Sequence, residues 1–92
     1  MSYKIDYDID LDEALKKVPK RDAKSVKEKI ENLAEDPRPH GSIKLSGKEL
    51  YRIRYGNYRI LYKIFDDRLV VLILDVDGRK DVYKKNKMSK WA

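Results

Sequence analysis

The stretch from Leu50 to Tyr83 most constrains the fold, because it contains consecutive segments with the character of strands. In the first two segments, tyrosine and isoleucine recur at every second position, and mostly basic residues lie between them. A period of two is typical of a strand whose two faces meet different surroundings. Gly56-Asn57 separates the segments, and both residue types tolerate the positive φ that a two-residue hairpin turn needs. The sequence therefore predicts an antiparallel hairpin over residues 51–62.

This turn determines which side chains share a face of the predicted hairpin. One face carries the pairs Tyr55–Tyr58, Ile53–Ile60 and Tyr51–Tyr62. On the other face, Arg54 lies opposite Arg59, and Arg52 lies opposite Leu61. We call this second side of the sheet the arginine face.

Like charges opposite each other on adjacent strands are destabilising. The arginine face is therefore best explained by a bound anion such as a run of phosphates, which guanidinium groups bind through paired hydrogen bonds. The alternative is a solvated outer face whose arginines pair with acidic residues elsewhere.

A third strand is predicted over 68–76, because RLVVLILDV is almost continuously apolar and suits a strand that is buried on both sides. Treating 66–67 as another two-residue turn places Tyr58 opposite Asp75, and Arg59 opposite Leu74. The strand ends at 77–78. The chain then continues to Arg79, Lys80 and Tyr83.

The first half of the chain predicts a strand followed by two helices. Residues 2–8 alternate between apolar and polar, as in a strand with one buried face. Asp10, with a glutamate three residues later, matches a capping box and begins a helix over 11–18. Pro19 ends that helix and is expected to be the first residue of the next, which runs from about 20 to 35.

A proline- and glycine-containing loop over 36–41 holds the single histidine, His40, which we expect at the surface without a catalytic role. A short strand around Ile43 and Leu45 follows. The predicted fold class is α+β, with an antiparallel sheet and an N-terminal helical hairpin packed on one face. We expect one domain over 1–92, with 84–92 as a basic tail.

The composition indicates which kinds of partner the chain can bind and which kinds of site it cannot form. The chain has 22 Lys and Arg against 16 Asp and Glu, a net charge of +6 that favours a polyanionic partner. It has no cysteine and one histidine, which excludes disulfides, thiolate sites and multi-histidine metal sites. Asp75 and Asp77 are the acids of a core strand, but nothing else converges on them, so we expect no metal and no cofactor. Without an apolar spanning segment or a signal peptide, we expect a soluble, cytoplasmic protein.

The run KLSGKELYRIRYGNYRILYKIFDDRLVVLILDVDGRKDVY resembles the RelE family of toxins from type II toxin–antitoxin pairs. The shared motifs are KL-x-G, Y-R-I-R, G-x-YR-x-x-Y and the final R-x-x-x-Y, in that order. The preceding strand and two helices fit the same fold, so the resemblance covers essentially the whole chain.

The resemblance implies a ribosome-dependent endoribonuclease that cuts mRNA in the ribosomal A site. A ribose 2′-hydroxyl would attack its own adjacent phosphate and break the 5′-oxygen bond without a metal. By position, the implied catalytic residues are Arg52, Arg54, Arg59, Arg79 and Tyr83. We expect further RNA contacts from Lys44, Lys48, Lys63 and Lys80. The implied partners are a RelB-like antitoxin with an acidic segment and the ribosome with its A-site mRNA, and no membrane.

Two departures from the family pattern concern proton transfer. Some members carry lysine at the positions of Arg52 and Arg54, and arginine does not deprotonate in proteins. Ser46 stands where some members have a basic residue. Lys48, Lys63 and Tyr83 remain alternatives for the proton-transfer role. The competing interpretation is a basic module of the same fold that binds RNA or an acidic protein without cleavage.

Overall fold

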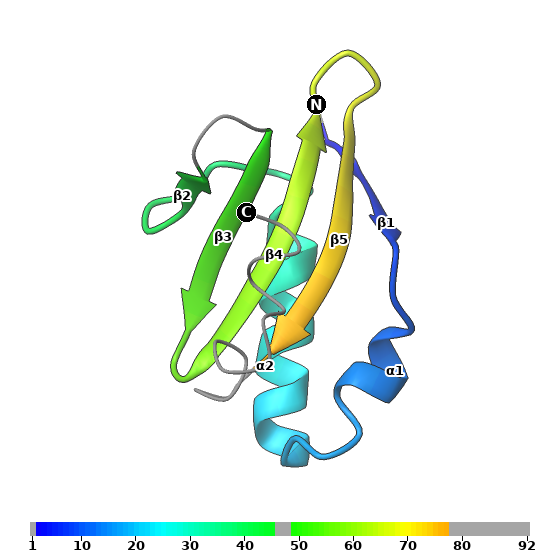
Figure 1. Ribbon diagram of the computed structural model, residues 1–92, viewed down its shortest axis with the longest axis vertical. Helices are drawn as coiled ribbons and strands as arrows, with labels where there is room; N and C mark the ends of the chain where they lie inside the picture. The colour runs from blue at the N-terminus through cyan, green and yellow to red at the C-terminus, as the bar shows by residue number, and fades with distance from the viewer. Residues whose placement is uncertain (1, 46–48, 78–92) are drawn as a thin grey trace.

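The computed structural model describes residues 2–45 and 49–77. Within them, the elements follow the order that the sequence predicts. They are β1 (Lys4–Tyr7), α1 (Leu11–Ala14), α2 (Lys20–Asn32), β2 (Ile43–Leu45), β3 (Leu50–Tyr55), β4 (Tyr58–Phe65) and β5 (Val70–Asp77). The strands form one five-stranded sheet in the order β1-β5-β4-β3-β2, with α2 on one side of it (Figure 1).

The sheet is mostly antiparallel, and this corrects the fully antiparallel sheet expected from the sequence. β1 pairs with β5 in parallel, from Lys4 opposite Val70 to Tyr7 opposite Ile73. Both helices and the other three strands lie between β1 and β5 in the sequence, so this pairing joins two segments that are far apart along the chain. β5 lies between β1 and β4, so it has a neighbour on each side, as suits its apolar run, although β4 and not β5 is the central strand.

Both helices are shorter than their apolar spacing predicts. The Asp10 side chain accepts a hydrogen bond from the Glu13 backbone N–H at 3.1 Å, so the expected N-terminal cap is present. α1 nevertheless ends at Ala14, and the chain continues in turns to Val18, the residue in which Pro19 disfavours helical geometry. Pro19 itself is the N-cap of α2 and not its first helical residue. After Asn32 the backbone bonds contract to i→i+3 spacing, which ends α2 before residue 35.

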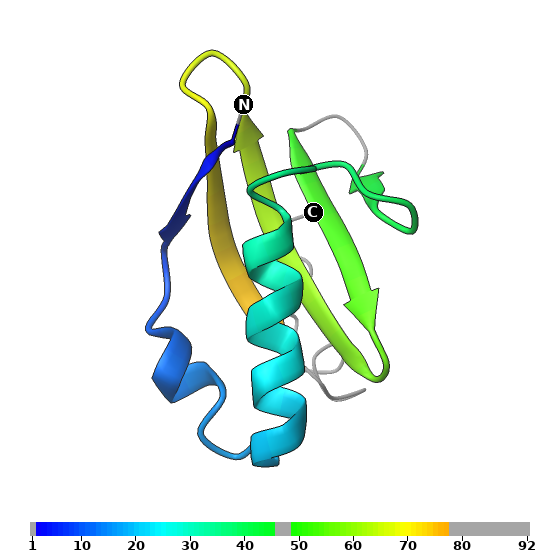
Figure 2. The same cartoon turned by 180° about the vertical axis from the view of Figure 1, so that it is seen from behind.

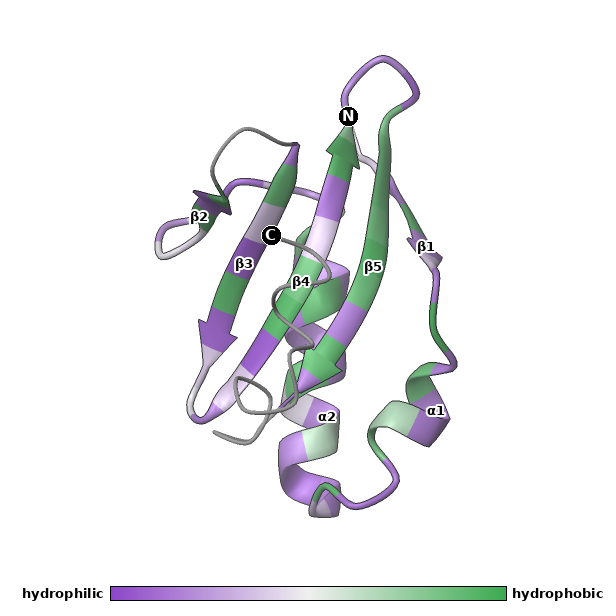
Figure 3. Cartoon of the chain, in the orientation of Figure 1, coloured by the Kyte–Doolittle hydropathy of each residue, from purple (hydrophilic) through white to green (hydrophobic). Residues whose placement is uncertain are grey.

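The main core lies between α2 and the tyrosine and isoleucine face of the sheet (Figure 2). Val26, Ile30 and Leu33 of the helix region meet Ile53 and Ile60 of the central hairpin, and all are almost fully buried. β5 is mostly hydrophobic, with a hydrophilic band near its end, whereas several hydrophilic bands interrupt β3 and β4 (Figure 3). The helix-covered face is therefore the one that the sequence alternation predicts.

The β3–β4 register agrees with the prediction at every pair. Tyr55 lies opposite Tyr58, Arg54 opposite Arg59, and the pairing continues to Leu50 opposite Lys63. At the turn, Gly56 has a φ of +58°, as in a two-residue turn with glycine at its first central position.

The predicted register of β4 with β5 is wrong. The connection is a four-residue turn over 66–69 and not two residues, so Phe65 pairs with Val70. Leu69 closes this turn with a φ of +54°, a conformation that side chains other than glycine rarely adopt. The register then shifts once more between Leu61 and Tyr62, at a β-bulge.

A polar network ties the loop after α2 to the β4–β5 turn. Both terminal nitrogens of Arg38 donate to the Asp66 carboxylate, at 3.2 and 2.8 Å, and the Tyr3 hydroxyl donates to it at 2.7 Å. Arg38 Nε also donates to the Tyr51 hydroxyl at 3.0 Å, and its guanidinium lies over the Tyr51 ring. The hydrogen bonds from Arg38 and Tyr3 lower the pKa of Asp66 to about 2.

The same loop is held to β4 by a buried tyrosine. The Tyr62 hydroxyl donates to the Pro37 carbonyl at 2.8 Å, and its ring stacks on Tyr51 with 5.8 Å between centroids. Burial raises the pKa of Tyr62 to about 12, so the hydroxyl stays a donor at neutral pH. None of the helices in the described part of the chain is long and apolar enough to cross a membrane.

Candidate nucleic-acid interface

The β3–β4 hairpin brings three of the predicted arginines together on the side of the sheet away from α2. Arg54 and Arg59 are direct cross-strand partners, and Arg52 lies opposite Leu61 one pair further along. Arg54 is exposed, whereas Arg52 and Arg59 are half-buried. The arginine face is therefore a feature of the folded chain and concentrates positive charge over two adjacent strands.

One atom of this face suggests that a ligand completes it. The Nε of Arg52 is buried and has no hydrogen-bond partner among the described residues. A buried donor without an acceptor costs roughly 1–3 kcal/mol, and more for a charged group. Such an atom is uncommon in native proteins. An incoming phosphate oxygen would supply the acceptor.

Two of the lysines expected to bind RNA, Lys44 and Lys63, lie on opposite sides of the sheet. Lys63 lies opposite Leu50, which places it on the arginine face one pair beyond Arg52. Lys44 pairs in register with Tyr51 and so lies on the other side of the sheet, where it forms an ion pair with Glu49 at 3.3 Å. Lys63 is therefore the one of these two that extends the arginine face.

An apolar patch adjoins the charged groups. Leu50, Leu61 and Leu74 form a small buried cluster separate from the main core, with Leu45 and Leu72 packed against it. Aliphatic carbon around the guanidinium groups lowers the local dielectric and strengthens their attraction for an anion.

The structure also places two acids on the arginine face, which the sequence reading missed. Asp77 is the cross-strand partner of Arg59, and Asp75 that of Leu61. The prediction had put Asp75 opposite Tyr58 on the core side. The cause is the β-bulge, which adds one residue to β5 and exchanges the faces of all residues beyond it. No residue pattern in the sequence marks that position.

The remaining predicted site residues, Lys48, Arg79, Lys80 and Tyr83, lie outside the described residues, as does Ser46. His40 is exposed in its loop, as expected. Over 2–45 and 49–77, no group of three or more histidines or acids is placed to hold a metal ion.

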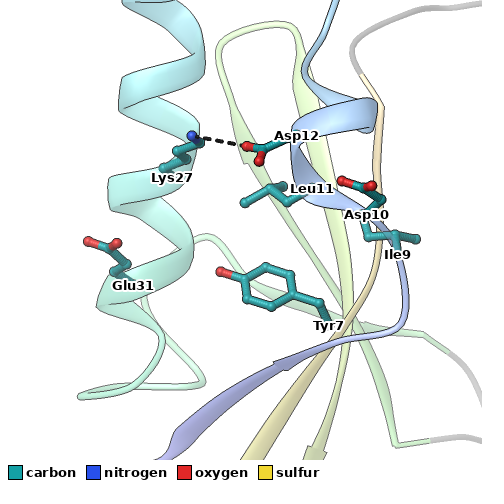
Figure 4. A pocket seen from close by; sticks show the side chains of 7 residues that line it. All are labelled: Tyr7, Ile9, Asp10, Leu11, Asp12, Lys27 and Glu31. Carbon is teal, nitrogen blue, oxygen red and sulfur yellow. Dashed lines mark hydrogen bonds and ion pairs between the residues drawn. The ribbon is translucent and has the colours of Figure 1, made fainter.

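A groove of about 440 Å³ lies on the helix side, between the β1–α1 segment and α2 (Figure 4). Its lining residues are Tyr7, Ile9, Asp10, Leu11, Asp12, Lys27 and Glu31. Burial and the negative charge of Glu31 raise the pKa of Tyr7, and Lys27 is paired with Asp12 at 3.5 Å. The excess of acids makes this groove a poor site for phosphates, so the arginine face is the better candidate for binding nucleic acid.

Comparison with known proteins is consistent with this geometry. A family model described as the ParE toxin of type II toxin–antitoxin systems, parDE, matches residues 4–83. The chain is 34% identical to RelE1 of Methanocaldococcus jannaschii over 74 residues, which cover 76% of this chain and 82% of that protein. It is 46% identical to the toxin RelG of Mycobacterium tuberculosis over 35 residues, 38% of this chain and 40% of RelG.

Solved structures show the same fold. A RelE–RelB complex from Pyrococcus horikoshii matches with a TM-score of 0.75 and 30% identity, covering 87% of this chain and 98% of that one. The RelBE2 toxin–antitoxin complex from Mycobacterium tuberculosis matches with a TM-score of 0.73 and 29% identity, covering 86% and 100%.

Proposed function

This chain belongs to the ParE/RelE family of toxins from type II toxin–antitoxin systems, and from that premise we propose that it cuts messenger RNA on the ribosome. The family model is named for ParE, whereas the relatives and the solved structures are named for RelE. The observation that carries the proposal is the arginine face, with three guanidinium groups on adjacent strands and a buried Arg52 Nε that has no acceptor within residues 2–45 and 49–77.

The proposed reaction relies on the ability of guanidinium groups to bind phosphate oxygens and stabilise negative charge on them. In the proposed step a ribose 2′-oxygen attacks the adjacent phosphorus, the bond to the 5′-oxygen breaks, and negative charge accumulates on the phosphate oxygens. Arg59, at the centre of the face, would stabilise that charge through preorganised donors, together with Arg79. Arg52 and Arg54 would hold and bend the backbone, and Tyr83 would stack on a base at the cut.

Proton transfer needs groups other than the arginines, which remain protonated. Of the alternatives drawn from the sequence, Lys63 is the one that the described structure places on the arginine face. A weak acid–base set would make the rate depend on how the ribosome positions the RNA, because correct orientation alone contributes several orders of magnitude. We therefore propose that the chain cuts free RNA slowly and ribosome-bound RNA fast, and that it acts in the cytoplasm.

We further propose a cognate RelB-like antitoxin as the resting partner. Relatives of this chain were solved as complexes with RelB, in Pyrococcus horikoshii and in Methanococcus jannaschii. An acidic segment that lies over the arginine face would bind the clustered guanidinium groups and exclude RNA.

Primer extension on a message translated in the presence of the purified chain tests the proposal. The expected result is a set of cuts at codon spacing that require ribosomes and disappear when antitoxin is added. Intact message in translating reactions would refute the endonuclease.

Arg52 and Arg54 stand where some members of the family carry lysine, and this favours one alternative, a domain that binds RNA or an acidic protein without cutting it. In that case the same experiment would give intact message, while the chain still sedimented with ribosomes.

A further inference from the structure

The two acids on the arginine face are placed there by the bulge in β5. Before the bulge, Tyr62 pairs with Ile73, and beyond it Leu61 pairs with Asp75. Continued without the bulge, the first register would turn Asp75 and Asp77 toward α2 and Val76 away from it. Instead, Val76 belongs to the main core and is 6% exposed, so the acids occupy the opposite face.

Asp77 completes a row of three charges across the sheet. Arg59 has Arg54 as its partner on one side and Asp77 on the other. Directly paired residues in antiparallel strands have Cβ atoms about 4.5–5.5 Å apart. Asp75 lies opposite Leu61, so it is only a diagonal neighbour of Arg59, at about 7–8 Å. Asp77 is therefore the acid that the register places next to the central arginine.

A carboxylate in this position has two opposite effects. It offsets the repulsion between Arg54 and Arg59, and so stabilises the folded protein when no RNA is bound. It also repels a phosphate that approaches the same guanidinium. A substrate phosphate would consequently compete with the Asp77 carboxylate for the positive charge of Arg59.

We propose that Asp77 is a built-in competitor of phosphate at Arg59, and that it makes the arginine face discriminate against free RNA. The repulsion weakens the binding of RNA that is free in solution. RNA held on the ribosome is presented at a high effective concentration, which compensates for the weaker binding. This inference rests on the proposed function and concerns the selectivity of the same site. It assigns Asp77 a role in specificity and none in bond cleavage.

Binding of a labelled single-stranded RNA oligonucleotide, followed by fluorescence anisotropy at several salt concentrations, tests the inference. Removal of one charge a few ångströms from a bound phosphate should tighten binding by Asp77→Asn by roughly three- to tenfold at low salt. Asp67→Asn makes the same charge change in the exposed β4–β5 turn at the far end of the strands, and should bind like the parent. Asp77→Glu keeps the charge and should also resemble the parent.

A double-substitution cycle ties the effect to Arg59. In an Arg59→Ala background, the gain from Asp77→Asn should largely vanish, because the competition requires the guanidinium. Asp77→Ser supplies a second neutral variant should the asparagine variant melt below the assay temperature.

The inference would be overturned if Asp77→Asn and Asp77→Ser both bound RNA no more tightly than the parent. It would also be overturned if neither these variants nor the parent bound RNA. Ribosome-dependent cleavage by the parent decides the proposed function separately. A parent that cuts on ribosomes while Asp77→Asn leaves free-RNA affinity unchanged would retain its function and lose only this role for Asp77.

Discussion

At the scale of single residues, Arg59 combines a central place on the arginine face with independence from the core. Its side chain is half-buried on the side of the sheet away from α2, so its removal opens no cavity in the main core. Arg59→Ala should change the free energy of unfolding by less than about 1 kcal/mol. The loss of a charge aimed at the reacting phosphate should lower ribosome-dependent cleavage by about a hundredfold or more. Thermal melting and a ribosome-programmed cleavage assay measure the two effects.

Arg21→Ala is the matched control, because Arg21 is an exposed arginine on α2, on the other side of the sheet. It should melt and cut like the parent. Early melting of Arg59→Ala, or cleavage at the parental rate, would contradict the assignment of Arg59 to the site.

Asp66 gives a pH-dependent prediction at the same scale. Its pKa falls from the ordinary 3.8 to about 2 because Arg38 and Tyr3 donate hydrogen bonds to the charged carboxylate. A group with a lowered folded-state pKa stabilises the fold above its unfolded pKa, and this contribution is lost as the pH falls from 3.8 toward 2. Asp66→Asn should therefore be less stable than the parent at neutral pH and lose less stability over that acidic interval.

Chemical denaturation at pH 7, 4, 3 and 2 measures this difference. Asp67→Asn, in the next position and exposed, serves as the control and should keep the parental acid dependence. Parallel acid profiles for the parent and Asp66→Asn would show that the Arg38–Asp66 pair does not hold the loop in solution.

At the scale of elements, β4 is the central strand and separates two surfaces with different roles. Ile60 follows Arg59 along the chain but points into the main core, where it is 0% exposed. Ile60→Ala should destabilise the fold by about 2–5 kcal/mol, because it leaves a cavity between α2 and the sheet. Its cleavage rate per folded molecule should stay near that of the parent, which is the reverse of the pattern for Arg59→Ala.

An exposed isoleucine provides the control for the core substitution. Ile43 on the edge strand β2 is 48% exposed, so Ile43→Ala should change stability by less than about 0.5 kcal/mol. A small loss for Ile60→Ala, or a fall in the cleavage rate of its folded fraction, would contradict the separation of core and site across β4.

At the scale of the whole molecule, charge is distributed unevenly between the two sides of the sheet. The arginine face is basic, whereas the groove beside α2 has three acids and one lysine among its lining residues. A protective partner should therefore bring acidic side chains to the arginine face. Arg54→Glu, at an exposed position, should weaken binding to the cognate antitoxin by about tenfold or more, because it places like charges across the interface. Lys16→Glu, exposed beside α1, should leave this affinity near the parental value.

Calorimetric titration of the purified antitoxin into each variant measures the effect. Equal affinities for Arg54→Glu and the parent would place the antitoxin elsewhere on the molecule.

The central hairpin could be predicted from the sequence alone, because its information is local. The alternation of tyrosine and isoleucine with basic residues, together with Gly56-Asn57, determines the pairing of Arg54 with Arg59. The same alternation selects the face that α2 covers. The capping acid Asp10 and the breaks near residues 19 and 36 give the number and order of the helices, although not their ends.

The tertiary structure decided the register of β5 with β4, which local sequence patterns do not determine. β5 is apolar on both faces, so its sequence does not distinguish one register with β4 from the next. Packing with distant segments makes the choice. Leu74 is the extra residue of the bulge and joins the second apolar cluster, and the changed register beyond it takes Val76 into the main core. That choice, made by side-chain packing across the whole sheet, is what brings Asp77 beside Arg59.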